Sequence, residues 1–135
     1  MILEIEKYGW AKIYIGENGS IFIGDASYLS DVPLDFLEAF KLYVDNGKIP
    51  VIKCDEEGSE FIIVVDDITT YIISEREKTE CFSWEISCEN FIRQIITDIE
   101  LQLDGVADFM CEEDGKEERK EKIISLVSYI KEKLK

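Results

Sequence analysis

Two blocks of the chain alternate hydrophobic and polar residues, which is the pattern of strands with one buried face. The first block lies within 3–28 and holds an Asn18-Gly19 pair between two such runs, the strongest short signal for a β-hairpin. The second block lies within 49–86 and consists of apolar or alternating runs separated by acidic turns. We therefore expect about six or seven antiparallel strands in these two blocks.

One run in the second block differs from the others. Residues 61–65 are all apolar, which is typical of a strand that is covered on both faces. The neighbouring run at 49–53 contains Pro50, which lacks an amide hydrogen and therefore favours the edge of a sheet.

Three further segments repeat hydrophobic residues at intervals of three and four, which predicts helices. They lie near 33–45, 88–111 and 117–134. Ser30 or Asp31 can cap the first helix, and Gly47 follows its last turn. The second contains Gly105, which ends or loosens it.

A length of 135 residues fits one α+β domain, in which the helices pack on the antiparallel sheet. The C-terminal helix within 116–135 is basic and amphipathic. It can dock on its own domain, on a partner or on a membrane surface. We expect the first, because its charge complements the acidic remainder of the chain.

The charge of the chain is strongly negative and uneven. Thirty acidic and fifteen basic residues give a formal net charge of −15. Residues 1–115 hold 26 of the acids and 8 of the bases, whereas 116–135 hold 4 and 7. Such a body repels nucleic acid and attracts basic partners, so we expect a protein partner and no nucleic acid.

Candidate chemistry is sparse. The chain has no histidine, which excludes Ser-His-Asp and Cys-His catalysis and removes the commonest metal ligand. Cys54, Cys81, Cys88 and Cys111 form no C-x-x-C pair, and we interpret them as reduced, mostly buried thiols. We expect a protein without enzymatic activity, metal or cofactor.

No apolar run reaches the roughly 20 residues of a membrane helix. The first six residues carry acids where a secretory signal needs basic residues and then a continuous apolar stretch. We therefore expect a cytoplasmic protein that does not enter a membrane.

Several segments, in their order and spacing, carry a family resemblance. These are Glu4–Ala11, Ser27–Asp31, Leu34–Phe40, Asp55–Phe61, Phe82–Ile86 and Phe91–Ile96. Over about 3–103 the chain resembles small bacterial immunity-type proteins that are encoded beside polymorphic or contact-dependent toxins. The resemblance implies a cytosolic protein that binds and blocks a cognate toxin and performs no chemistry itself.

The acidic turns of the second block are the candidate contact residues. They are Asp55, Glu56, Glu57, Asp66 and Asp67. We expect them to cluster in one meander and to steer a basic toxin domain onto the protein.

Two other functions fit the same residues. One is a structural module that self-associates through a strand or the C-terminal helix, and the oligomeric state stays open. The other is a small-molecule-binding domain with Trp10, Trp84 and tyrosines around a pocket in the sheet.

Overall fold

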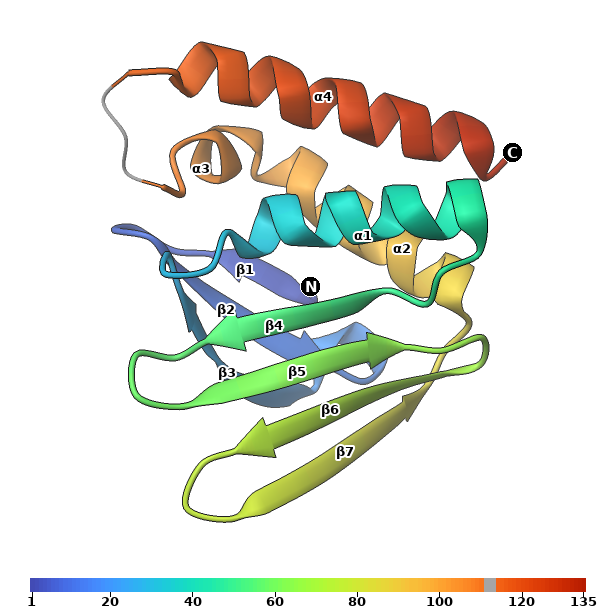
Figure 1. Ribbon diagram of the computed structural model, residues 1–135. Helices are drawn as coiled ribbons and strands as arrows, with labels where there is room; N and C mark the ends of the chain where they lie inside the picture. The colour runs from blue at the N-terminus through green and yellow to red at the C-terminus, as the bar shows by residue number, and fades with distance from the viewer. Residues whose placement is uncertain (111–113) are drawn as a thin grey trace.

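The computed structural model describes residues 1–110 and 114–135, and it confirms the α+β fold (Figure 1). In chain order the elements are β1 (Leu3–Ile5), β2 (Trp10–Ile15), the 3-10 helix η1 (Glu17–Gly19), β3 (Ile21–Ser27), α1 (Val32–Asn46), β4 (Val51–Asp55), β5 (Glu60–Val65), β6 (Thr69–Glu75), β7 (Thr79–Glu85), α2 (Cys88–Leu101), α3 (Leu103–Ala107) and α4 (Lys116–Lys133). The C-terminal helix is thus present. Cys111 lies outside the described residues.

The two predicted blocks form two separate antiparallel sheets. The three-stranded sheet has the order β1-β2-β3, and the four-stranded sheet has the order β4-β5-β6-β7. Arg76 joins the two sheets, because its Nη2 donates to the carbonyl oxygen of Ile23 in β3 at 2.8 Å.

The expectation that 61–65 is covered on both faces is wrong. Phe61, Ile63 and Val65 are buried, but Ile62 and Val64 between them are half-buried. β5 therefore alternates like an ordinary strand with one covered face. Its second face carries Ile62 and Val64, which the described helices and sheets cover less completely than the residues of the first face.

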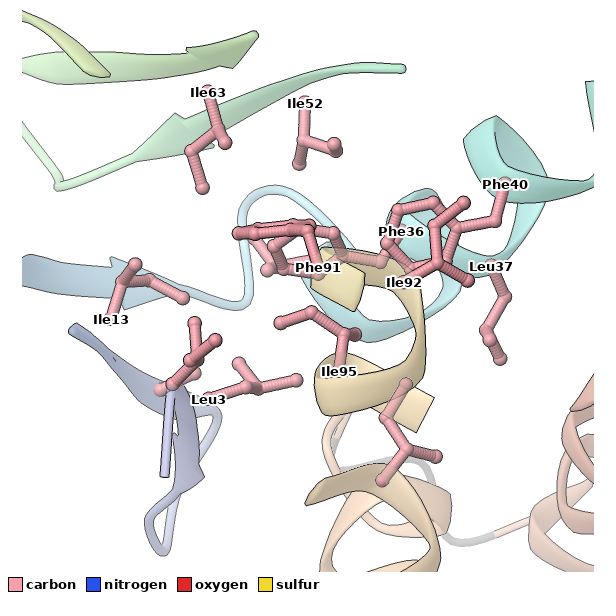
Figure 2. Packing of buried hydrophobic residues seen from close by; sticks show 14 of the residues in the cluster. Leu3, Ile13, Phe36, Leu37, Phe40, Ile52, Ile63, Phe91, Ile92 and Ile95 are labelled. Carbon is pink, nitrogen blue, oxygen red and sulfur yellow. The ribbon is translucent and has the colours of Figure 1, made fainter. Parts of the chain in front are cut away.

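The hydrophobic core lies between the inner face of the four-stranded sheet, the three-stranded sheet, α1 and α2 (Figure 2). Ile52 and Ile63 point toward Phe91 of α2, and Leu3 and Ile13 approach from the other sheet. The ring of Phe91 also lies 6.1 Å from that of Phe36 in α1, centroid to centroid. Burying these large side chains supplies the main drive for folding.

The start and end of α1 follow the sequence signals. The carboxylate of Asp31 accepts a hydrogen bond from the Leu34 amide at 3.4 Å, and Pro33 lies in the first turn. Gly47 follows the helix with φ 70°, a conformation that glycine adopts without a steric penalty.

The predicted helix at 88–111 divides at Gln102, which has φ −124° and ψ 30°. Its side chain bonds to the free edge of β1. Gln102 Oε1 accepts from the Ile5 amide at 2.7 Å, and Nε2 donates to the Leu3 carbonyl oxygen at 2.8 Å. One turn earlier, Asp98 Oδ2 accepts from the amides of Ile2 and Leu3 at 2.8 and 3.0 Å. These two side chains close the β1 edge of the three-stranded sheet.

The basic helix α4 docks on its own domain, where it packs against α1 and α3. Ile123, Val127 and Ile130 on its apolar face are buried. Both terminal nitrogens of Arg119 bind the Asp31 carboxylate, at 2.6 and 2.9 Å. This bidentate pair fixes the start of α4 over the start of α1.

Candidate protein-binding surface

The outer face of the four-stranded sheet carries an apolar patch. Residues that pair in register point to the same face, so Val51, Val64, Tyr71 and Ser83 form one row, and Lys53, Ile62, Ile73 and Cys81 form the next. Val51 is 54% exposed and Tyr71 is 38% exposed. We call the apolar members of these rows the outer patch: Val51, Ile62, Val64, Tyr71, Ile73 and Cys81.

Acidic side chains lie at both ends of the outer patch. Asp55, Glu60 and Glu75 form the next row on the same face, and Glu85 lies at the opposite end. Lys53 Nζ lies 3.2 Å from Glu60 Oε2, so one of these acids is paired. An apolar centre with a charged rim is the arrangement found at protein interaction sites.

The acidic charge of this sheet has little internal compensation. The segment 51–85 holds ten acidic and three basic residues. The basic residues of α4 instead face the acids of the helical layer: Arg119 pairs with Asp31, Lys120 with Asp104, Lys122 with Glu38, and Lys131 with Glu100. In Figure 1, α4 lies on the opposite side of the molecule from β6 and β7. Ten acidic against three basic residues leave this sheet with an excess of seven negative charges, which the basic residues of α4 do not offset.

The five predicted contact acids do not form one cluster. Asp55, Glu56 and Glu57 lie where β4 turns into β5, whereas Asp66 and Asp67 lie where β5 turns into β6. In an antiparallel meander these turns are at opposite ends of β5, about 20 Å apart for a six-residue strand. Figure 1 shows the two turns on opposite sides of the sheet. The expectation that these five acids cluster is therefore wrong.

Within the first turn, Glu56 is engaged inside the protein. Its carboxylate accepts from Arg76 Nε at 3.2 Å, from Arg76 Nη2 at 2.8 Å and from Ser59 Oγ at 3.1 Å. Only 11% of its side chain is exposed. Glu57 is exposed, and Asp55 lies at the rim of the outer patch. Glu56 thus holds Arg76 between the sheets and offers little to a partner.

β7 provides a free edge beside the outer patch. In the described part of the chain, no strand pairs with it on the side away from β6. Five of its seven residues are exposed, and Phe82 and Trp84 are half-buried. Figure 1 shows β7 at the bottom of the molecule with no segment beside this edge.

The inner side of β7 borders an open cleft of about 660 Å³. Trp84, Glu85 and Ile86 form one wall, and α2 and η1 contribute the others. Trp10 lines a different shallow hollow, with residues of the β1–β2 turn. The two tryptophans therefore line different hollows, whereas the small-molecule site that we considered would place both around one pocket.

Among residues 1–110 and 114–135, three titratable groups have strongly raised pKa values, and none belongs to the outer patch. Burial raises the pKa of Asp35 to about 6, with further contributions from Asp31 and Glu38. Burial also raises the pKa of Cys54, and that of Cys88 to about 11. Both thiols are thus protonated at neutral pH and poor nucleophiles.

The cysteines differ in their environments. Cys54, Cys81 and Cys88 carry free thiols; Cys54 and Cys88 are buried, as we expected for most of the cysteines, and Cys81 is exposed on the outer face. Within residues 1–110 and 114–135, no three cysteine or acidic side chains are arranged to hold a metal ion. The same residues include no helix with the length and hydrophobicity needed to cross a bilayer.

No known family model, curated protein or solved structure matches the chain. The outer patch was missed in the sequence partly because two of its residues, Ile62 and Val64, were assigned to a doubly covered strand. The sequence of β6 provided no signal for this face, because the buried face holds Thr70, Ile72 and Ser74 while the outer face holds the large apolar side chains of Tyr71 and Ile73.

Proposed function

We propose that this chain is a non-catalytic binding protein, which uses the outer patch and its acidic rim to bind a protein with an apolar surface surrounded by lysine and arginine. The observation that carries the proposal is the exposed apolar centre on a sheet that holds ten acidic and only three basic residues. The apolar centre would supply affinity, and the rim would steer a basic partner and exclude acidic ones.

The resemblance to immunity-type proteins supports a more specific proposal for the partner. We propose that it is a basic toxin domain encoded beside the gene for this chain, and that the chain neutralises it in the cytoplasm by covering its working surface. This role requires a rigid scaffold and a complementary surface, and it requires no catalytic residue. The acids that remain candidates for contact are Asp55 and Glu57 at one end of the sheet and Asp66 and Asp67 at the other.

The test uses the purified product of the adjacent gene and isothermal titration calorimetry. Tyr71→Lys places a positive charge in the outer patch and should weaken binding at least about tenfold, which corresponds to about 1.4 kcal/mol. Leu101→Lys introduces the same charge at a 72% exposed leucine of α2 and should change binding less than about twofold. Affinity should also fall as salt rises.

Equal effects of the two lysine substitutions would contradict the proposed surface. Absence of binding to the adjacent product would contradict the toxin identity. As a cellular readout, expression of the adjacent gene alone should stop growth, and co-expression of this chain should restore it.

A further inference from the structure

The four edges of the two sheets differ in how they are protected. Asp98 and Gln102 close the β1 edge by hydrogen bonds to its backbone. The β3 edge gives its Ile23 carbonyl oxygen to Arg76. At the β4 edge, the Asp55 amide donates to Ser30 Oγ at 3.1 Å and α1 packs against the strand. β7 is the edge for which the described residues provide no such cover.

An open strand of this length is a template for another strand. Thr79–Glu85 pairs with β6 over all seven residues, so its backbone is held extended and in register. Within this strand, Cys81 Sγ makes a weak contact with the Phe82 carbonyl oxygen at 3.9 Å. The edge carries neither proline nor glycine, which natural proteins use to interrupt pairing.

We propose that β7 accepts an extended segment of the partner as an additional antiparallel or parallel strand of the four-stranded sheet. This inference rests on the proposed function and specifies how the basic partner attaches. Main-chain hydrogen bonds along β7 would give affinity, and side chains on the two faces of the added strand would give specificity.

The surroundings of β7 define the chemistry of that segment. On the outer face an added strand would lie next to Cys81 and Ser83 and would extend the rows of the outer patch, which favours apolar side chains at its centre. On the inner face it would lie next to Phe82 and Trp84, beside the open cleft.

Charge decides between a partner and a second copy of this chain. Four glutamates lie in or beside β7: Glu75, Glu77, Glu80 and Glu85. Lys78 lies close to them, and no described carboxylate forms an ion pair with it. Two β7 strands would bring these acids together, whereas a segment with lysine or arginine at its ends would complement them. The structure therefore favours a basic segment with an apolar centre.

The experiment measures backbone amide exchange of the full chain by NMR, with and without a synthetic peptide of about nine residues. The peptide carries Val-Ile-Val at its centre and alternates lysine and threonine at both ends. Control peptides replace the central isoleucine by proline, or every lysine by glutamate. We expect the lysine peptide to slow exchange of alternate β7 amides by about tenfold or more and the controls to leave them unchanged.

Three results would overturn the inference: no slowing at β7, equal slowing by the glutamate peptide, or β7 amides that are already slow in the free protein and become slower with protein concentration. The last would assign the edge to a second copy. If β7 exchange is unchanged while Tyr71→Lys still weakens binding to the adjacent gene product, strand addition fails and the proposed function stands. If both are unaffected, the proposed function fails as well.

Discussion

Closure of the β1 edge by α2 makes a strong prediction about Asp98. One carboxylate oxygen, Oδ2, accepts both the Ile2 and the Leu3 amide, and the residue is only 7% exposed. Asp98→Ala removes both acceptors at once and leaves two backbone donors at a buried edge. Asp98→Asn keeps an oxygen that can accept the same bonds but lacks the charge that strengthens them.

Each buried donor without a partner lowers the free energy of unfolding by about 1–3 kcal/mol, and a water molecule that binds at the strand edge restores part of this loss. We therefore expect Asp98→Ala to lower the free energy of unfolding by about 2–4 kcal/mol and Asp98→Asn by about 1 kcal/mol. Urea unfolding followed by circular dichroism measures both. Thr97→Ala, at the exposed neighbour whose hydroxyl bonds within the helix to the Arg93 carbonyl oxygen at 2.9 Å, should change stability by less than about 0.5 kcal/mol. Equal effects of the Asp98→Ala and Thr97→Ala substitutions would refute the reasoning.

Three further substitutions test the electrostatics and packing, each by unfolding at equilibrium. Asp35→Asn should stabilise the protein at pH 7 by roughly 1 kcal/mol, because the raised pKa makes the ionised carboxylate unfavourable in the folded state; the full shift is discounted for the partial exposure of the group. This gain should shrink as pH falls from about 6 to about 4, where Asp35 becomes protonated in both states, and a gain independent of pH would contradict the assigned cause. Gly19→Ala should lower the free energy of unfolding by about 2 kcal/mol or more, because φ is 66° and a Cβ would collide with the Met1 carbonyl oxygen. Gly47→Ala, where φ is 70° and the space is open, should lower it by about 1 kcal/mol. Equal losses would argue against the collision. Arg119→Met should lower the free energy of unfolding by about 2 kcal/mol, because the bidentate pair with Asp31 is lost. Lys135→Met, which removes an exposed ion pair, should leave stability nearly unchanged. No loss of stability in Arg119→Met would show that the pair does not fix α4.

Local signals predicted much of the fold. The alternation in two blocks, the Asp31 cap and Gly47 each report on neighbouring residues, and the structure follows them. The division at Gln102 was not predictable in this way, because it depends on hydrogen bonds to Leu3 and Ile5, nearly a hundred residues away in the chain.

The candidate site was harder to predict for the same physical reason. Acids in turns are easy to recognise, but whether two turns lie together depends on strand direction, and here β5 separates them. Glu56 has the same local sequence signal as Glu57, yet Arg76 engages it from twenty residues away. The exposure of Tyr71 depends on which layer covers each face of the sheet, which no local pattern specifies.

The most direct test of the sheet as the working surface is hydrogen–deuterium exchange of the chain, free and bound to the adjacent gene product. We predict that binding slows amide exchange mainly within Thr69–Glu85, which spans β6 and β7, and leaves α1 and α4 unchanged. Protection confined to α1 and α4, with β6 and β7 unaltered, would contradict the account.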